Sequence, residues 1–123
     1  MRSMIFYVLG FLFSPDLSHV LLIRKAKPSW QAGRLNGIGG KVEPGESNLK
    51  AMIRECFEET RLVHKSWSHF CTMTGPDFRV DCFAGVTPDL NKAEGTNAEP
   101  AVRVDVSLIQ SGKRGLVDGL QWL

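Results

Sequence analysis

The sequence predicts a single α+β or mixed α/β domain, and three observations lead to this fold class. The chain has 123 residues, which is a typical size for one domain. Short apolar runs rich in β-forming residues are separated by turn signals in several parts of the chain. One segment, residues 47–61, instead repeats its apolar residues at helical spacing. We therefore expect a sheet covered by a long helix, within one domain spanning residues 1–123.

The N-terminal segment predicts a β-hairpin. Residues 4–13 form an apolar run, residues 14–16 read Ser-Pro-Asp, and residues 19–23 form a second apolar run of strand length. The first run is too short to span a bilayer. It is also not followed by a small-residue cleavage site, so a buried strand explains it better than a signal peptide.

The middle of the chain predicts a loop, a short apolar stretch and the main helix. Residues 24–34 are polar and basic, residues 35–38 are apolar, and residues 39–45 are expected to form a glycine-rich loop. In the helix that follows, Ser47 or Asn48 is the expected N-cap. The residues expected to form its buried stripe are Leu49, Met52, Ile53, Cys56 and Phe57.

The C-terminal half predicts three more strands and a final helix. The strands are expected at 67–73, 78–86 and 102–106, a polar loop at 87–100, and a short helix at 116–123.

Composition narrows the function classes. A net charge of +2 suits an anionic small molecule but is too small to indicate a nucleic-acid binder, and no basic-aromatic stripe is apparent. The three cysteines form no CxxC pair, so we expect reduced thiols in a cytoplasmic protein with no membrane partner.

Three glutamates and an arginine share one face of the expected helix. Arg54, Glu55, Glu58 and Glu59 fall within an arc of about 140°. Clustered carboxylates repel one another, and a divalent cation relieves that repulsion. An all-oxygen ligand set points to Mg²⁺ or Mn²⁺. The alternative is a solvated acidic face in which Arg54 pairs with Glu58.

Together with the loop before the helix, these residues resemble the Nudix hydrolase family. The family pattern is Gly, five residues, Glu, seven residues, then Arg-Glu-U-x-Glu-Glu-x-Gly-U, where U is a bulky apolar residue. The match covers residues 40–62 with fixed spacings, so chance does not explain it. Its matching positions are Gly40, Glu46, Arg54, Glu55, Glu58 and Glu59, with Cys56 and Leu62 at the U positions.

One position departs from the pattern, because Arg61 replaces the second glycine. In the family this glycine follows the catalytic helix, where a left-handed residue ends it. Arginine in that conformation costs about 1 kcal/mol. The departure therefore concerns how the helix ends, since no carboxylate is lost.

The resemblance implies an α/β/α sandwich with a mixed sheet and metal-dependent cleavage of a phosphoanhydride bond. It implies Mg²⁺ (or Mn²⁺) held by Glu55, Glu58, Glu59 and the Gly40 carbonyl. Arg54 is expected to orient Glu55 and Glu46. The general base is expected to be Glu55 or a glutamate of a later loop, and there we select Glu99, with Glu94 second.

The segment from Leu35 to Val42 resembles Nudix enzymes that remove oxidised purine nucleoside triphosphates, in which the residue at the Asn36 position contacts the base. The alternative is that Asn36 satisfies a turn. Candidate phosphate partners are Lys41 and the basic residues Arg24, Lys25, Lys27 and Arg34. Candidate stacking residues, for which core packing is the alternative, are Trp30, Phe78 and Trp122.

Three functions remain open from the sequence. The first is a nucleoside triphosphate pyrophosphatase, and the second is a hydrolase of ADP-ribose or dinucleoside polyphosphates. The third is a nucleotide sensor without hydrolysis, against which the complete set of three glutamates argues. A homodimer that covers the end of the chain at Trp122 and Leu123 is a further expectation.

Overall fold

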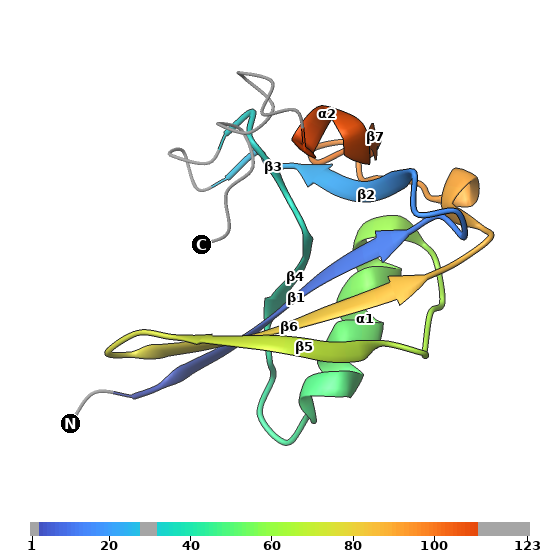
Figure 1. Ribbon diagram of the computed structural model, residues 1–123. Helices are drawn as coiled ribbons and strands as arrows, with labels where there is room; N and C mark the ends of the chain where they lie inside the picture. The colour runs from blue at the N-terminus through green and yellow to red at the C-terminus, as the bar shows by residue number, and fades with distance from the viewer. Residues whose placement is uncertain (1–2, 28–31, 111–123) are drawn as a thin grey trace.

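The structure is a computed structural model that describes residues 3–27 and 32–110. Within these residues the chain forms a seven-stranded sheet and two α-helices (Figure 1). The strands are β1 (Ile5–Phe13), β2 (His19–Arg24), β3 (Leu35–Asn36), β4 (Ile38–Lys41), β5 (Ser68–Thr74), β6 (Phe78–Val86) and β7 (Ala101–Asp105). The helices are α1 (Asn48–Thr60) and α2 (Val106–Gln110), with a 3₁₀ turn, η2, at Leu90–Lys92.

The sheet is mixed, as the resemblance implied. Its order is β3-β2-β1-β6-β5, with β4 also paired to β1 and β7 also paired to β2. Strands β1 and β6 run parallel, and the other pairs are antiparallel. The predicted N-terminal hairpin forms from β1 and β2, and the strands predicted at 67–73 and 78–86 pair as a second hairpin, β5 and β6.

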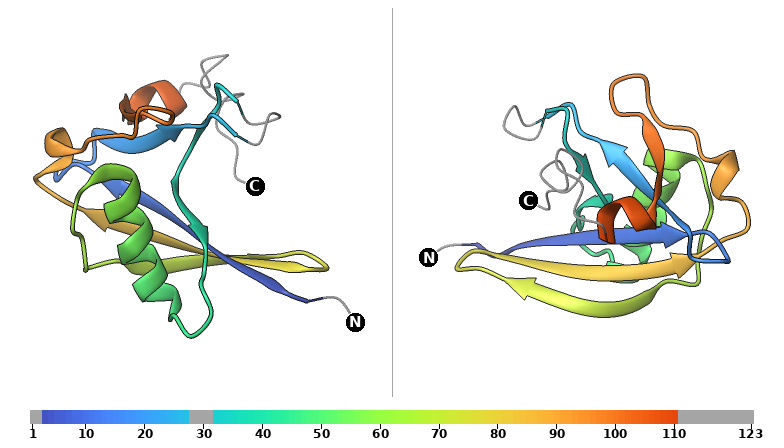
Figure 2. Two further views of the ribbon diagram at one scale, coloured as in Figure 1. Left: turned by 180° about the vertical axis from the view of Figure 1, so that it is seen from behind. Right: turned by 45° about the horizontal axis from the view of Figure 1, so that its top comes forward.

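The helices lie on opposite sides of β2 (Figure 2). Leu21 and Ile23 belong to the core cluster that contains the buried residues of α1. Val20 and Leu22 belong to a second cluster, against which Val106 of α2 packs. The alternation of side chains along β2 therefore joins two apolar layers, which gives the expected α/β/α sandwich.

Helix α1 begins and ends at the predicted positions. The Ser47 side chain caps the N-terminus by accepting a hydrogen bond from the Lys50 amide. At the other end Arg61 adopts a left-handed conformation with φ 65°, and its amide donates to the Phe57 carbonyl at 2.8 Å. The helix therefore ends as it would with the family glycine, although arginine occupies the position.

The predicted buried stripe of α1 is partly wrong. Leu49 is 42% exposed and Phe57 is 43% exposed. Ala51 and Thr60 are buried in their place. Ala51 is small enough for close packing. The Thr60 hydroxyl can be buried because it donates a hydrogen bond to the Cys56 carbonyl at 2.7 Å. The residues of α1 that are buried are Ala51, Met52, Cys56 and Thr60.

Residues 39–41 form part of a strand, which corrects the predicted loop. Gly39 pairs with Leu9, and Gly40 pairs with Val8. A Cβ atom on Gly39 would lie 2.0 Å from the Val8 carbonyl oxygen. The glycine that suggested a loop is therefore needed for close strand pairing.

The C-terminal prediction is confirmed only in part. Strand β7 coincides closely with the predicted strand at 102–106, and it is followed by α2, which was not predicted. The helix expected at 116–123 lies outside the described residues. Neither helix in the described part of the chain is long and apolar enough to cross a membrane.

Candidate active site

Arg54 connects α1 to the loop that follows β4. Its guanidinium donates two hydrogen bonds to the Glu46 carboxylate, from Nε to Oε2 at 2.8 Å and from Nη2 to Oε1 at 3.0 Å. Nη2 also donates to the Lys41 carbonyl at 3.0 Å. On the helix itself, Nη1 donates to Glu55 at 2.8 Å and to Glu58 at 3.0 Å. The loop and the acidic face are thereby held together by one cation.

Arg54 and Glu46 each stabilise the charged form of the other. The hydrogen bond from Arg54 lowers the pKa of the Glu46 carboxyl, despite the opposing effect of desolvation. The same bond is the largest cause that raises the pKa of Arg54. Both groups therefore stay ionised across the neutral range, as an orienting pair must.

Glu55 approaches the backbone of β4 at Gly40. A Cβ atom at position 40 would lie 2.7 Å from the carboxyl carbon of Glu55, so only glycine leaves this space open. The Glu55 side chain is 16% exposed. The first residue of the motif is therefore glycine because a carboxylate occupies the position of its side chain.

Glu59 lies beside Glu55 and is more deeply buried than the predicted exposed face suggested. One of its carboxyl oxygens accepts a hydrogen bond from the Gly39 amide at 3.1 Å. Burial raises the pKa of Glu59, and the hydrogen bond and charge of Glu55 raise it further. Two carboxyl groups thus share one site against the backbone of β4.

The paired carboxyls fit a divalent cation. A cation between Glu55 and Glu59 would relieve their repulsion, and an all-oxygen donor set suits Mg²⁺ or Mn²⁺. Glu58 is 49% exposed and is turned toward Arg54. Within residues 3–27 and 32–110, no three histidine, cysteine or acidic side chains already converge as a metal site. In this structure Glu58 pairs with Arg54 through both of its carboxylate oxygens.

A cleft of about 900 Å³ gathers charged residues from distant parts of the sequence. Its walls carry both acids and bases, so it can hold a cation and the phosphates that the cation would bind. The lining residues are Lys25, Lys27, Lys41, Glu43, Arg54, Glu55 and Glu99.

A smaller cavity of about 170 Å³ adjoins the cleft, because Lys25, Lys27 and Lys41 line both. Asn36 also lines the cavity and is 7% exposed. Its Oδ1 accepts a hydrogen bond from the Gly37 amide at 2.8 Å. The oxygen of the side chain thus hydrogen-bonds the backbone of the turn, and the amide nitrogen can donate to a ligand. Apolar residues of the cavity include Tyr7, Leu9 and Val80, which the sequence did not single out.

Three predicted substrate residues, Arg24, Arg34 and Phe78, do not line these cavities. Arg24 donates from Nη1 to the Gly33 carbonyl at 2.9 Å. The ring of Phe78 packs across Gly75, at the tip of the β5–β6 hairpin. Their substrate roles stay predictions. Trp30 and Trp122 lie outside the described residues.

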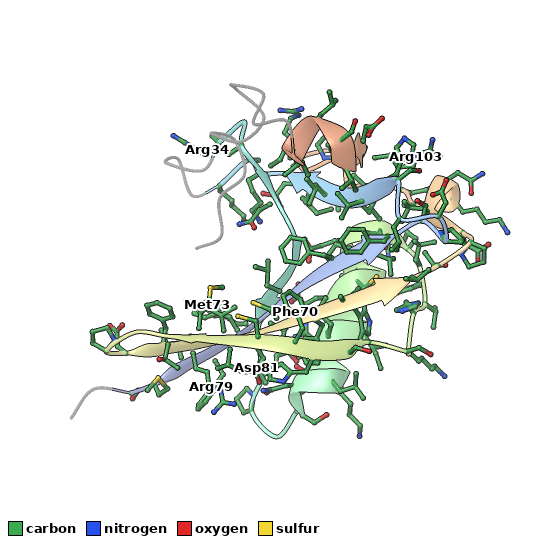
Figure 3. The ribbon with its side chains drawn as sticks, in the orientation of Figure 1. Arg34, Phe70, Met73, Arg79, Asp81 and Arg103 are labelled. Carbon is green, nitrogen blue, oxygen red and sulfur yellow. The ribbon has the colours of Figure 1, made fainter. Side chains whose placement is uncertain are left out.

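The face of β6 nearest the start of α1 carries a buried carboxylate, Asp81, that was not predicted from the sequence. Figure 3 shows Asp81 and Arg79 on one side of strands β5 and β6, and Phe70 and Met73 on the other. Asp81 accepts hydrogen bonds from Thr72 and Arg79, at 2.8 and 3.2 Å, and from Asn48 at the start of α1. A charged residue within an apolar strand was the available signal.

Comparison with known proteins identifies the family. A model of the NUDIX domain matches residues 6–105. A MutT structure, from work on Aliivibrio salmonicida and Vibrio cholerae, is 22% identical with a TM-score of 0.74, and the match covers 94% of this chain and 96% of the other. A MutT/Nudix family protein from Listeria innocua is 21% identical with a TM-score of 0.73, over 90% and 84% of the two chains.

A third similar structure is the NUDIX domain of Shewanella oneidensis NrtR, described in complex with ADP ribose. It is 16% identical with a TM-score of 0.68, over 90% of this chain and 79% of the other. These structures share the fold, and the family model covers most of the chain and includes the motif around Arg54. The chain therefore belongs to the Nudix hydrolase family.

Proposed function

We propose that the chain hydrolyses a phosphoanhydride bond in a nucleoside triphosphate, ordinary or oxidised, to give a monophosphate and pyrophosphate. One observation carries the proposal: the cleft that contains Glu55 shares three lysines with the cavity that contains Asn36. A triphosphate in the cleft and a base in the cavity would belong to one ligand, with Lys25, Lys27 and Lys41 between them.

The carboxyl groups of α1 are proposed to hold Mg²⁺ or Mn²⁺. Glu55 and Glu59 form the buried part of the site, the Gly40 carbonyl is a further oxygen donor, and Glu58 joins them from the exposed side. When bound, the cation supplies positive charge to phosphate oxygens and lowers the pKa of water. Arg54 positions Glu55 and, through Glu46, the loop after β4.

Three carboxylates line the cleft, Glu43, Glu55 and Glu99, and the sequence suggested the last two as candidates for the general base. Glu55 lies beside the proposed metal site, and Glu99 lies on the loop before β7. Glu99 accepts hydrogen bonds from the amides of residues 26 and 27, whereas Glu55 accepts one from Arg54.

Base recognition is proposed for Asn36. Because its carbonyl oxygen accepts from Gly37, the side chain would donate from its amide nitrogen to an acceptor on the base. A purine edge with a carbonyl oxygen or ring nitrogen meets this requirement.

ADP-ribose is the second candidate substrate, because the similar NUDIX domain of NrtR is described in complex with it. Binding without hydrolysis is a third reading, and Glu55, Glu58 and Glu59 are the residues that argue against it. The described cysteines are unpaired, which is consistent with the proposed cytoplasmic location. A homodimer stays a prediction that light scattering would test.

The experiment is a substrate panel with purified protein and Mg²⁺. It compares ordinary and oxidised deoxynucleoside triphosphates, ADP-ribose and diadenosine polyphosphates, with products separated by anion exchange. Glu55→Gln is the test variant. Asp77→Asn is the control, because it removes an exposed carboxylate at the β5–β6 turn.

Monophosphate and pyrophosphate from a triphosphate, with loss of activity in Glu55→Gln alone, would support the proposal. Cleavage of ADP-ribose instead would select the second candidate. If no nucleotide is cut while one still binds, the hydrolytic proposal is wrong for this chain.

A further inference from the structure

Strand pairing brings Glu99 next to the basic segment that follows β2. Strands β2 and β7 are antiparallel, and Ile23 pairs with Ala101. Residues 25–27 extend beyond the end of β2, and Glu99 comes just before the start of β7. The two segments therefore meet at the same edge, although more than 70 positions separate them, and both line the cleft.

The Glu99 carboxylate is occupied by this segment. Oε2 accepts a hydrogen bond from the Ala26 amide at 2.8 Å and a longer one from the Lys27 amide at 3.4 Å. Oε1 lies 3.4 Å from the Lys25 ammonium. The Glu99 side chain is 18% exposed, so most of its surface is in contact with the protein.

Glu99 is itself held in a closed turn. Its amide donates to the Thr96 hydroxyl at 2.9 Å, and the Thr96 amide donates to the Glu99 carbonyl at 3.2 Å. With Ala101 paired in β7 nearby, the backbone on both sides of the carboxylate is fixed. Such a group is suited to holding another segment in place.

The electrostatics oppose a role in proton abstraction. Burial alone would raise the pKa of Glu99, but the Ala26 amide and the charge of Lys25 outweigh it and lower the pKa. A general base works best when its pKa lies near the operating pH. A carboxylate stabilised in its charged form by three donors is a weak proton acceptor.

We propose that Glu99 is a positioning residue, whose carboxylate anchors residues 25–27 so that Lys25 and Lys27 enter both the cleft and the adjoining cavity. The inference rests on the proposed function, because the lysines are then held for the phosphates of a nucleotide. It assigns Glu99 a different role from the general base that the sequence suggested, and it leaves that role to Glu55.

The experiment compares Glu99→Gln with Glu99→Ala in the full chain. Glutamine keeps a carbonyl oxygen that can accept from the Ala26 amide but cannot act as a base, whereas alanine removes both functions. Asp89→Ala is the matched control, because Asp89 pairs with Lys92 on the same loop but lines neither cavity of the site. For each protein we would measure kcat, KM, the melting temperature and the exchange rates of the Ala26 and Lys27 amide hydrogens.

We expect Glu99→Gln to keep kcat within about threefold and to keep both amides protected. Glu99→Ala should raise KM by about tenfold or more, with a smaller effect on kcat, and should accelerate exchange at Ala26. The melting temperature separates this result from general unfolding, and Asp89→Ala should behave as wild type.

Two results would overturn the inference. A loss of about 10²-fold or more in kcat for Glu99→Gln, with unchanged KM, would identify Glu99 as the general base. Unchanged KM and unchanged exchange in Glu99→Ala would show that the anchor is unimportant. The exchange measurement needs no turnover, so it tests the anchor even if the substrate panel shows that the proposed function is wrong.

Discussion

The Arg54 guanidinium and the Glu46 carboxylate form a two-pronged ion pair, with hydrogen bonds of 2.8 and 3.0 Å across eight positions of the sequence. This pair fixes the loop before α1 against the acidic face of the helix. Lysine has a single ammonium group and cannot reproduce both bonds while also reaching Glu55.

Arg54→Lys should therefore lower kcat by about 10–100-fold, the usual effect of losing a group that orients metal ligands. Steady-state kinetics with a Mg²⁺ titration would measure it. Arg103→Lys on β7 is the control, because Arg103 is exposed and lies outside the cleft. Equal activity of wild type and Arg54→Lys would show that the bidentate geometry is not needed.

Gly40→Ala should impair the proposed metal site while leaving the fold intact. The added Cβ meets the flexible end of Glu55 at 2.7 Å, so the carboxylate moves while the backbone can stay in place. We expect a nearly normal melting temperature with weaker Mg²⁺ activation. Gly39→Ala is the contrasting variant, because its Cβ meets the Val8 carbonyl oxygen at 2.0 Å and must displace a strand. If both variants lose stability but keep normal Mg²⁺ activation, the space taken by Glu55 does not explain the glycine at position 40.

Asp81 should contribute to acid sensitivity. Burial alone would raise its pKa, but hydrogen bonds from Thr72, Arg79 and Asn48 outweigh this and lower it below the ordinary value of 3.8. A depressed folded-state pKa stabilises the fold above the unfolded-state value, and the contribution is lost as the pH falls through the folded-state pKa.

Asp81→Asn should be less stable near neutral pH by about 1–3 kcal/mol, because it loses charge-assisted bonds in a buried site. The free energy of unfolding should then fall less between about pH 5 and about pH 2 than in wild type. Urea unfolding at several pH values measures both effects. Parallel pH curves for the two proteins would contradict the role assigned to Asp81.

Asn36→Asp tests base recognition. Aspartate keeps an oxygen for the Gly37 amide but removes the amide donor of Asn36. We expect KM for the preferred nucleotide to rise by about tenfold or more, since one specific base contact is lost. The melting temperature reports any cost of the buried charge. An unchanged KM in a normally folded variant would place base recognition elsewhere.

Arg61→Gly should leave turnover within about twofold, because the Arg61 backbone already adopts the left-handed conformation that glycine favours. Stability should change by no more than about 1 kcal/mol. Relief of left-handed strain is offset by a more flexible unfolded chain and by the loss of the Arg61 contact over the Phe57 ring, at 5.4 Å. Calorimetry and kinetics would check both, and a large loss of turnover would reveal a functional role for Arg61.

The sequence predicted elements that depend on nearby residues. Ser47 caps α1 as expected, because the capping bond joins it to Lys50, only three positions away. The two hairpins were also predictable, since turn residues separate adjacent strands in each. The exposure of Leu49 and Phe57 was not predicted, because helical spacing defines an apolar arc but not how that arc is turned against the sheet.

The sequence by itself determined the family motif, the helix that carries it and the acids Glu55, Glu58 and Glu59, because each depends on fixed spacing within residues 40–62. Only the tertiary structure decided which groups surround them. The parallel pairing of β1 with β6, the contact of Glu59 with Gly39 and the placement of Glu99 beside Ala26 join segments far apart in the chain. Such contacts arise from strand order and packing, which no local spacing encodes.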